Sequence, residues 1–136
     1  MQIQISNSRD ELAGVMTALE DFVDSAGLDV EAAQAAELAL DELLANIISY
    51  GYRDLEVHQI TVEFDVIEGA MRIRLVDDGI PFNPFDQEEP DLGSCIERRE
   101  IGGVGIHLVK NFMDDYSYER NDEHNIVTLS KTLTRA

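Results

Sequence analysis

Residues 59–75, QITVEFDVIEGAMRIRL, decide the fold, because their polarity changes at almost every position. Ile60, Val62 and Phe64 alternate with polar neighbours, and the alternation resumes after Gly69. A period of two, with a glycine between the two runs, is typical of an antiparallel hairpin that buries one face. We therefore predict two paired strands here, with the hydrophobic core on one side of the sheet.

Helical spacing replaces this alternation on both sides of the hairpin. Apolar residues three and four positions apart predict a helix that ends at Gly27 and a second helix that runs from Asp29 to about Gly51. The same spacing returns at 104–112. Further strands are expected at residues 1–5, 116–119 and 126–133. Helices grouped apart from an antiparallel sheet predict an α+β two-layer sandwich.

Length and charge limit the classes of function. The 136 residues are enough for one domain, 1–136, with one core. Twenty-eight Asp and Glu against ten Lys and Arg give a net charge of -18, which argues against direct binding to nucleic acid or anionic lipid. With a single cysteine, Cys95, and neither a secretory signal nor a stretch of bilayer length, we expect a cytoplasmic location and no membrane contact.

The second predicted helix carries a polar pair, Glu42 and Asn46. A spacing of four places both side chains on one helix face, about one turn apart. The Asn46 amide oxygen can ligate Mg²⁺, and the Glu42 carboxylate can accept a proton from a hydroxyl group. The alternative is a pair of solvated polar residues on an exposed helix face.

Two glycine-containing segments complete a set of candidate binding residues. Asp77 and Gly79 end a predicted strand, where a carboxylate can accept a hydrogen bond from the exocyclic amine of adenine; alone, this segment is equally an acidic turn. Gly103-Val104-Gly105 precedes the last helix, where free backbone N–H groups can face a phosphate; alone, it is equally a flexible loop. The long loop between them, about 83–101, is of a length typical of functional or disordered segments.

In their order and spacing, Glu42-x-x-x-Asn46, Asp77-x-Gly79 and Gly103-x-Gly105 resemble the N, G1 and G2 boxes of the histidine-kinase-like ATPase (GHKL) superfamily. Within that superfamily, residues 103–114 resemble the small anti-sigma-factor serine kinases. The resemblance implies the Bergerat ATP-binding fold, a two-layer α/β sandwich with helices on one face of a mainly antiparallel, mixed sheet.

The resemblance also implies residue roles and the cofactors ATP and Mg²⁺. Asn46 would ligate Mg²⁺, Glu42 would act as or position the general base, and Asp77 would bind the adenine amine beside Gly79. The loop at 83–101 would be the ATP lid. The remaining ATP-binding residues would be Gly103, Val104, Gly105, Thr128 and the lid arginines Arg98 and Arg99. Three features depart from the family pattern. Tyr50 replaces a frequent His, Asn125 replaces a frequent Gly, and Arg98 and Arg99 lie close to, but not clearly at, the position of the family's phosphate-contacting arginine.

The implied reaction transfers the γ-phosphoryl group of ATP to a serine of an anti-sigma antagonist (STAS-type) protein, in a partner-switching pathway that regulates transcription. Such proteins form homodimers and bind a sigma factor. The competing interpretation is a non-catalytic module in which ATP orders the lid so that the protein sequesters a sigma factor or another regulator. Retention of Glu42 favours the kinase, whereas the displaced lid arginines, Arg98 and Arg99, favour the module.

Overall fold

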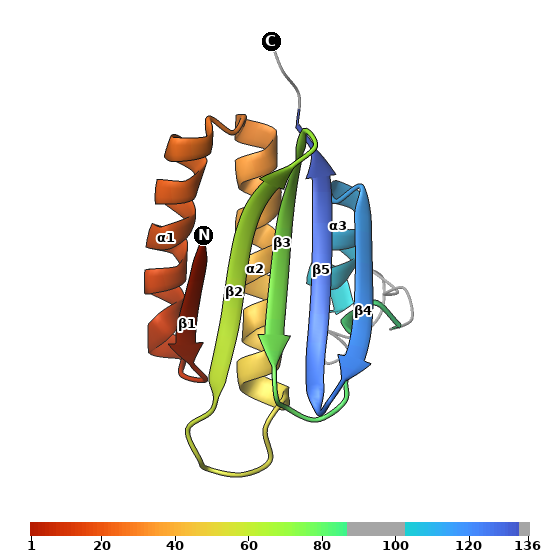
Figure 1. The fold of residues 1–136 in the computed structure, drawn as a ribbon. Coiled ribbons are helices and arrows are strands. Elements are labelled where there is room, and N and C mark those ends of the chain that lie inside the picture. Colours follow the sequence, from red (N-terminus) through yellow and green to blue (C-terminus); the bar gives the residue numbers. More distant parts are fainter. Residues whose placement is uncertain (87–102, 134–136) are drawn as a thin grey trace.

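The computed structural model describes residues 1–86 and 103–133 (Figure 1). In these residues the strands form one sheet in the order β1-β2-β3-β5-β4, and the helices cover one of its faces (Figure 1). The strands are β1 (Gln2–Ser6), β2 (Gln59–Ile67), β3 (Ala70–Asp77), β4 (Asp115–Asn121) and β5 (His124–Thr132). The helices are α1 (Leu12–Ala26), α2 (Val30–Tyr50) and α3 (Gly103–Phe112), with short 3-10 turns at Arg9–Glu11 and Pro84–Asp86. The two-layer α+β sandwich predicted from the sequence is confirmed.

The sheet is antiparallel in every described pair, so the expectation of a mixed sheet was wrong in that detail. The chain crosses from β3 through α3 to β4, and such a crossover gives strands that run in the same direction. Here β5 lies between β3 and β4 and is antiparallel to both. β3 and β4, which run in the same direction, are therefore not neighbours in the sheet.

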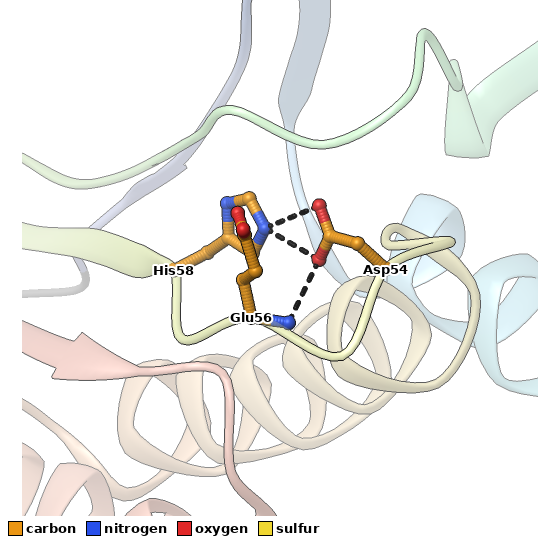
Figure 2. Close-up of side chains that lie close together, drawn as sticks. All are labelled: Asp54, Glu56 and His58. Atoms are coloured by element: carbon orange, nitrogen blue, oxygen red, sulfur yellow. Dashed lines mark hydrogen bonds and ion pairs between the residues drawn. The ribbon is translucent and has the colours of Figure 1, made fainter.

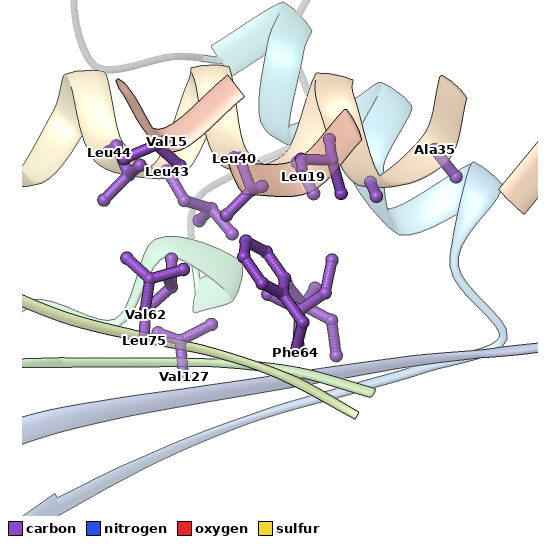
Figure 3. Packing of buried hydrophobic residues seen from close by; sticks show 14 of the residues in the cluster. Val15, Leu19, Ala35, Leu40, Leu43, Leu44, Val62, Phe64, Leu75 and Val127 are labelled. Carbon is purple, nitrogen blue, oxygen red and sulfur yellow. The ribbon is translucent and has the colours of Figure 1, made fainter. Parts of the chain in front are cut away.

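The core lies between the sheet and the helices. Ile60, Val62 and Phe64 of the predicted hairpin are fully buried, as are Ile73 and Leu75 on the facing strand β3. Figure 3 shows side chains from the sheet pointing toward the leucines of α1 and α2. Full burial of each such side chain contributes about 1.5–3 kcal/mol. The hydrophobic contact between α2 and the sheet thus fixes the helix that carries Glu42 and Asn46.

The ends of α1 and α2 follow local chemistry. Gly27 adopts φ 65°, the left-handed conformation in which glycine ends a helix without strain. Asp29 caps α2, because its Oδ1 accepts a hydrogen bond from the Ala32 N–H at 2.7 Å. Among the described residues, none of the helices is both long enough and apolar enough to cross a bilayer.

Candidate functional site

A pocket opens where the C-terminal part of α2 meets the end of β3 and the start of β5. It encloses about 410 Å³ when the space at its mouth is included. Its walls are mostly apolar, with a few polar groups, which is the usual composition of a small-molecule site. Asn46 and Asp77, 31 positions apart in sequence, line this same pocket. The lining residues are Leu43, Asn46, Ile47, Tyr50, Gly51, Asp77, Ile80, Phe82, Pro84, Asn125 and Val127.

Asp77 is the buried carboxylate of the pocket, with 4% of its surface exposed. Its Oδ1 accepts hydrogen bonds from the Gly79 N–H at 2.8 Å and from Asn125 Nδ2 at 3.0 Å. Oδ2 receives no hydrogen bond from the described residues, so it retains acceptor capacity for a ligand. Burial raises the pKa of Asp77 above its usual value, and the two hydrogen bonds to Oδ1 oppose that rise.

Asn125 is a pocket residue whose role the sequence does not indicate beyond its departure from the family pattern. Its Nδ2 donates to Asp77 and to the Ile80 carbonyl at 2.8 Å, while its Oδ1 accepts from the Phe82 N–H and the Tyr118 hydroxyl. One buried amide thus connects β3, the loop after it and β4. The sequence held a signal for this position. Residues two apart on a strand point to the same face of the sheet, and Asn125 lies two positions before the apolar, inward-facing Val127.

Gly79 allows the loop after β3 to dock on the end of α2. A Cβ atom at Gly79 would lie 2.5 Å from the Gly51 carbonyl oxygen and 2.9 Å from Asp77 Oδ1. The Ile80 N–H donates to the same Gly51 oxygen at 2.8 Å, and Arg120 donates to the Gly79 oxygen at 2.8 Å. These contacts hold Asp77 at a fixed place relative to α2.

At the other end of the pocket, Asn46 is 7% exposed, which excludes the alternative of a solvated surface residue. Its Nδ2 atom is buried and has no hydrogen-bond partner among the residues that the structure describes. Buried polar groups are almost always paired, so an unpaired amide that lines a pocket is typical of a ligand-binding position. The amide oxygen of the same side chain is a ligand that suits Mg²⁺, so Asn46 fits the metal that the family implies.

Glu42 lies one turn before Asn46 and is partly buried. Burial, and to a lesser extent the nearby charge of Asp41, raise the pKa of Glu42. A Cβ atom at Gly105 would collide with the Glu42 carboxylate, so glycine is what lets the first turn of α3 approach this close. The contact places Glu42 beside the N-terminus of α3, where the helix dipole is positive.

The structure does not bring every predicted residue to this pocket. Thr128 pairs with Arg74 and Ser117 in the middle of the sheet and is not among the pocket residues. Neighbouring side chains of a strand point to opposite faces, so Val127 faces the pocket and Thr128 faces away from it. The position of Thr128 therefore gives no support to a nucleotide contact.

The remaining predicted residues belong to α3 and to the loop before it. Gly103 and Val104 begin α3. In the predicted lid, Pro84 lines the pocket and the Phe85 ring packs on Tyr116 at 4.7 Å. Arg98, Arg99 and the rest of the lid from residue 87 to 101 lie outside the described residues.

Comparison with protein families gives one match that spans nearly the whole chain. The model described as "Histidine kinase-like ATPase domain" matches residues 5–131. The serine-protein kinase RsbW of Listeria monocytogenes is 28% identical over 102 residues, which cover 72% of this chain and 65% of that protein. RsbW of Bacillus mycoides is 23% identical over 144 residues, covering 99% of this chain and 86% of the relative.

Solved structures show the same fold at low sequence identity. The RsbU and RsbW domains of a Mycobacterium tuberculosis protein superpose with a TM-score of 0.66 and 14% identity, over 100% of this chain and 33% of that one. The histidine kinase domain of a blue-light activated kinase from Erythrobacter litoralis gives a TM-score of 0.57 and 20% identity, over 90% of this chain and 59% of that one. The family match and these structures agree on the Bergerat type of architecture.

Proposed function

Because this chain belongs to the histidine kinase-like ATPase family, we propose that it is an ATP-binding serine protein kinase of the anti-sigma-factor type. It would transfer the γ-phosphoryl group of ATP to a serine of an anti-sigma antagonist protein of the STAS type. The observation that carries this proposal is that Asn46 and Asp77 line one pocket, in which the buried Asn46 Nδ2 has no hydrogen-bond partner among the described residues. The kinases named RsbW among its relatives support the choice of a protein substrate.

The Asp77 end of the pocket would hold the adenine ring. Asp77 Oδ2 would accept a hydrogen bond from the exocyclic amine, while Oδ1 stays engaged by Gly79 and Asn125. Guanine carries a carbonyl oxygen at the corresponding position, and that oxygen would meet the carboxylate without a proton between them. The pocket is therefore expected to prefer ATP to GTP.

The Glu42 end would carry the chemistry. When bound, Mg²⁺ neutralises phosphate charge and orients the transferred group. Asn46 would hold the metal through its amide oxygen, and backbone N–H groups in the first turn of α3 would face the phosphates. Glu42, with its raised pKa, would accept the proton of the attacking serine hydroxyl.

The proposal extends to the partners and the setting. The chain would act as a cytoplasmic homodimer that binds a sigma factor as well as the antagonist and so regulates transcription. Its net charge of -18 favours partner surfaces that carry Lys and Arg. ATP binding without phosphoryl transfer would instead assign the chain as a binding module that sequesters its partner.

The test uses Glu42→Gln and a matched control, Glu37→Gln, which removes an exposed carboxylate from the same helix. We expect transfer of labelled γ-phosphate to an antagonist serine to fall about 10²- to 10⁴-fold in Glu42→Gln. ATP affinity, measured by calorimetry with Mg²⁺, should stay within about twofold of wild type, because glutamine keeps the shape of the side chain. The control should retain both activities.

Two results would contradict the assignment. Wild-type transfer rates in Glu42→Gln would remove Glu42 from the role of general base. A purified chain that binds no adenosine nucleotide would remove the kinase proposal altogether.

A further inference from the structure

The loop between α2 and β2, residues 51–58, carries a second cluster of polar side chains on its exposed side. Asp54, Glu56 and His58 each offer one metal-ligating atom, and these atoms lie within 4.8 Å of one another (Figure 2). His58 Nε2 is 2.8 Å and 3.0 Å from the two Asp54 carboxylate oxygens. Asp54 Oδ1 also accepts a hydrogen bond from the Glu56 N–H at 3.1 Å, which fixes the turn between them.

The His58 ring is fixed by contacts other than those of this triad. Its Nδ1 lies 3.2 Å from both carboxylate oxygens of Asp78, on the loop after β3. The ring stacks on Tyr52 with 4.3 Å between centroids and 18° between planes. The His58 N–H donates to Asn7 Oδ1, and the Asn7 N–H donates to the His58 carbonyl, both at 3.0 Å. His58 is therefore held with Nε2 toward Asp54.

The residues between these three, Leu55 and Val57, are apolar and exposed. Leu55 and Val57 are 104% and 80% exposed, so this segment leaves its apolar side chains in water. The side chains of Asp54, Glu56 and His58, which can ligate a metal, gather on the other side of the segment. A loop that merely connects two elements gains free energy by packing its apolar residues, and this one does the opposite.

The cluster has more carboxylates than cationic side chains to balance them. Three carboxylates, those of Asp54, Glu56 and Asp78, surround a single imidazole. In the part of the chain that the structure describes, His58 supplies the ion pairs made to Asp54 and Asp78, and none reaches Glu56. Even with His58 protonated, the group keeps an excess of negative charge.

We propose that Asp54, Glu56 and His58 bind one divalent transition-metal ion of the zinc class. His58 would ligate through Nε2, the two carboxylates would each supply an oxygen, and the fourth position would be open to water. An imidazole with two carboxylates is a common ligand set for Zn²⁺, whereas Mg²⁺ prefers oxygen ligands alone. Tetrahedral ligands at zinc lie about 3.3 Å apart, which the exposed Glu56 side chain can reach by changing its rotamer.

Asp78 would be a positioning residue for this metal. Histidine ligands usually donate their other ring N–H to a carboxylate, which fixes the tautomer and the direction of the ligating nitrogen. The 3.2 Å contacts from His58 Nδ1 to Asp78 provide that arrangement. Because Asp78 follows Asp77 directly, the ion would also brace the α2–β2 loop against the loop that closes the nucleotide pocket.

The experiment titrates the full chain with Zn²⁺ in a calorimeter, without nucleotide, and repeats the titration with Co²⁺ while recording its visible absorption. We expect one ion per chain. Glu56→Gln and His58→Gln should each lower the affinity at least tenfold. Asp78→Asn should lower it by about tenfold while keeping the stoichiometry of one. Glu56 is exposed, so this variant keeps the fold, which circular dichroism without metal checks.

The matched control is His124→Gln, which removes an exposed histidine whose Nδ1 contacts the Asp122 carbonyl oxygen at 2.8 Å. Unchanged zinc affinity in this variant supports the proposed site. A wild-type chain that binds zinc no better than Glu56→Gln would overturn the proposal. So would an equal loss in His124→Gln, or displacement of Zn²⁺ by an equal concentration of Mg²⁺.

Discussion

The two ends of the pocket differ in what holds their polar groups in place. At the end proposed to hold adenine, the base end, Asp77 and Asn125 come from neighbouring strands, and hydrogen bonds fix both side chains. At the other end, named the phosphoryl end after its proposed role, Asn46 lines the pocket. Glu42, one turn earlier on the same helix, is not among the lining residues and lies against Gly105 of α3. Hydrogen bonding thus organises one end, whereas helix packing organises the other.

Under the proposed function, this difference would separate nucleotide recognition from phosphoryl transfer. Directional hydrogen bonds pre-organise an acceptor, so changes at the base end should alter nucleotide affinity. The distance between two packed helices places a proton acceptor, so changes at the phosphoryl end should alter the rate of transfer while binding persists. Substitutions at each end can test whether the two properties are as independent as the structure indicates.

The largest effect on binding is expected for Asp77→Asn. The amide keeps one oxygen for Gly79 and Asn125 but presents an amino group where the second carboxylate oxygen was. Loss of a charged hydrogen bond to the adenine amine costs about 1.5–3 kcal/mol, or a Kd raised about 10- to 100-fold. Calorimetry with ATP and Mg²⁺ measures this change, and unchanged affinity would remove Asp77 from the adenine site.

The raised pKa of Asp77 sharpens the same test. Protonation of Asp77 removes the acceptor, so wild-type ATP affinity should fall as the pH falls through this raised pKa, while Asp77→Asn shows no such step. Folding stability has the opposite sign, because a raised pKa means that the folded state disfavours the charged form. This stabilising contribution is full below the pKa of the unfolded chain and is lost as the pH rises through the folded pKa. Asp77→Asn should therefore melt at a higher temperature than wild type at pH 7.

At the phosphoryl end, Gly105→Ala should push the Glu42 carboxylate out of its place, because the added Cβ would meet it, while the fold keeps nearly its full stability, since that carboxylate is the free end of a flexible side chain. Displacement of Glu42 should also reduce phosphoryl transfer more than ATP affinity. Gly14→Ala is the control, since Gly14 lies in α1 and an added Cβ there would have no described atom within 4 Å. That change should stabilise the helix by about 0.5–1 kcal/mol. Phosphoryl transfer at the wild-type rate in Gly105→Ala would contradict the close contact between Glu42 and the first turn of α3.

Asn125→Ala tests whether hydrogen bonding organises the base end. It leaves the Tyr118 hydroxyl and the Ile80 carbonyl without their partner, at a cost of about 1–2 kcal/mol in unfolding free energy. ATP affinity should fall as well, because Asp77 loses one of the two groups that orient it. Urea unfolding measures the first effect, and loss of stability with full ATP affinity would show that Gly79 alone positions Asp77.

The sequence predicted what local chemistry determines. Gly27 and Asp29 mark helix ends because their preferred conformations and side-chain caps act within a few residues. The hairpin around Gly69 follows from an alternation that only one strand register can bury. Glu42 and Asn46 share a face because helix geometry alone requires it.

The sequence could not predict which strand lies beside β3. Asn125 meets Asp77 across 48 positions of sequence, through the pairing of β3 with β5. That pairing depends on how the whole sheet packs against the helices, and the residues next to Asp77 or Asn125 in the sequence do not indicate it. For the same reason, the family resemblance led to Thr128, although inward direction alternates along β5 and selects Asn125 and Val127.

The smallest effect is expected for Thr128→Val, which keeps the branched shape and removes only the hydroxyl group. Thr128 lies on the face of the sheet opposite the pocket, so stability should change by less than about 0.5 kcal/mol and ATP affinity by less than about twofold. Val127→Thr is the matched opposite change, because Val127 is 4% exposed and lines the pocket. Its new hydroxyl would be buried without a partner, which should cost about 1–3 kcal/mol and weaken ATP binding. A larger loss of ATP affinity in Thr128→Val than in Val127→Thr would mean that the nucleotide reaches the other face of the sheet.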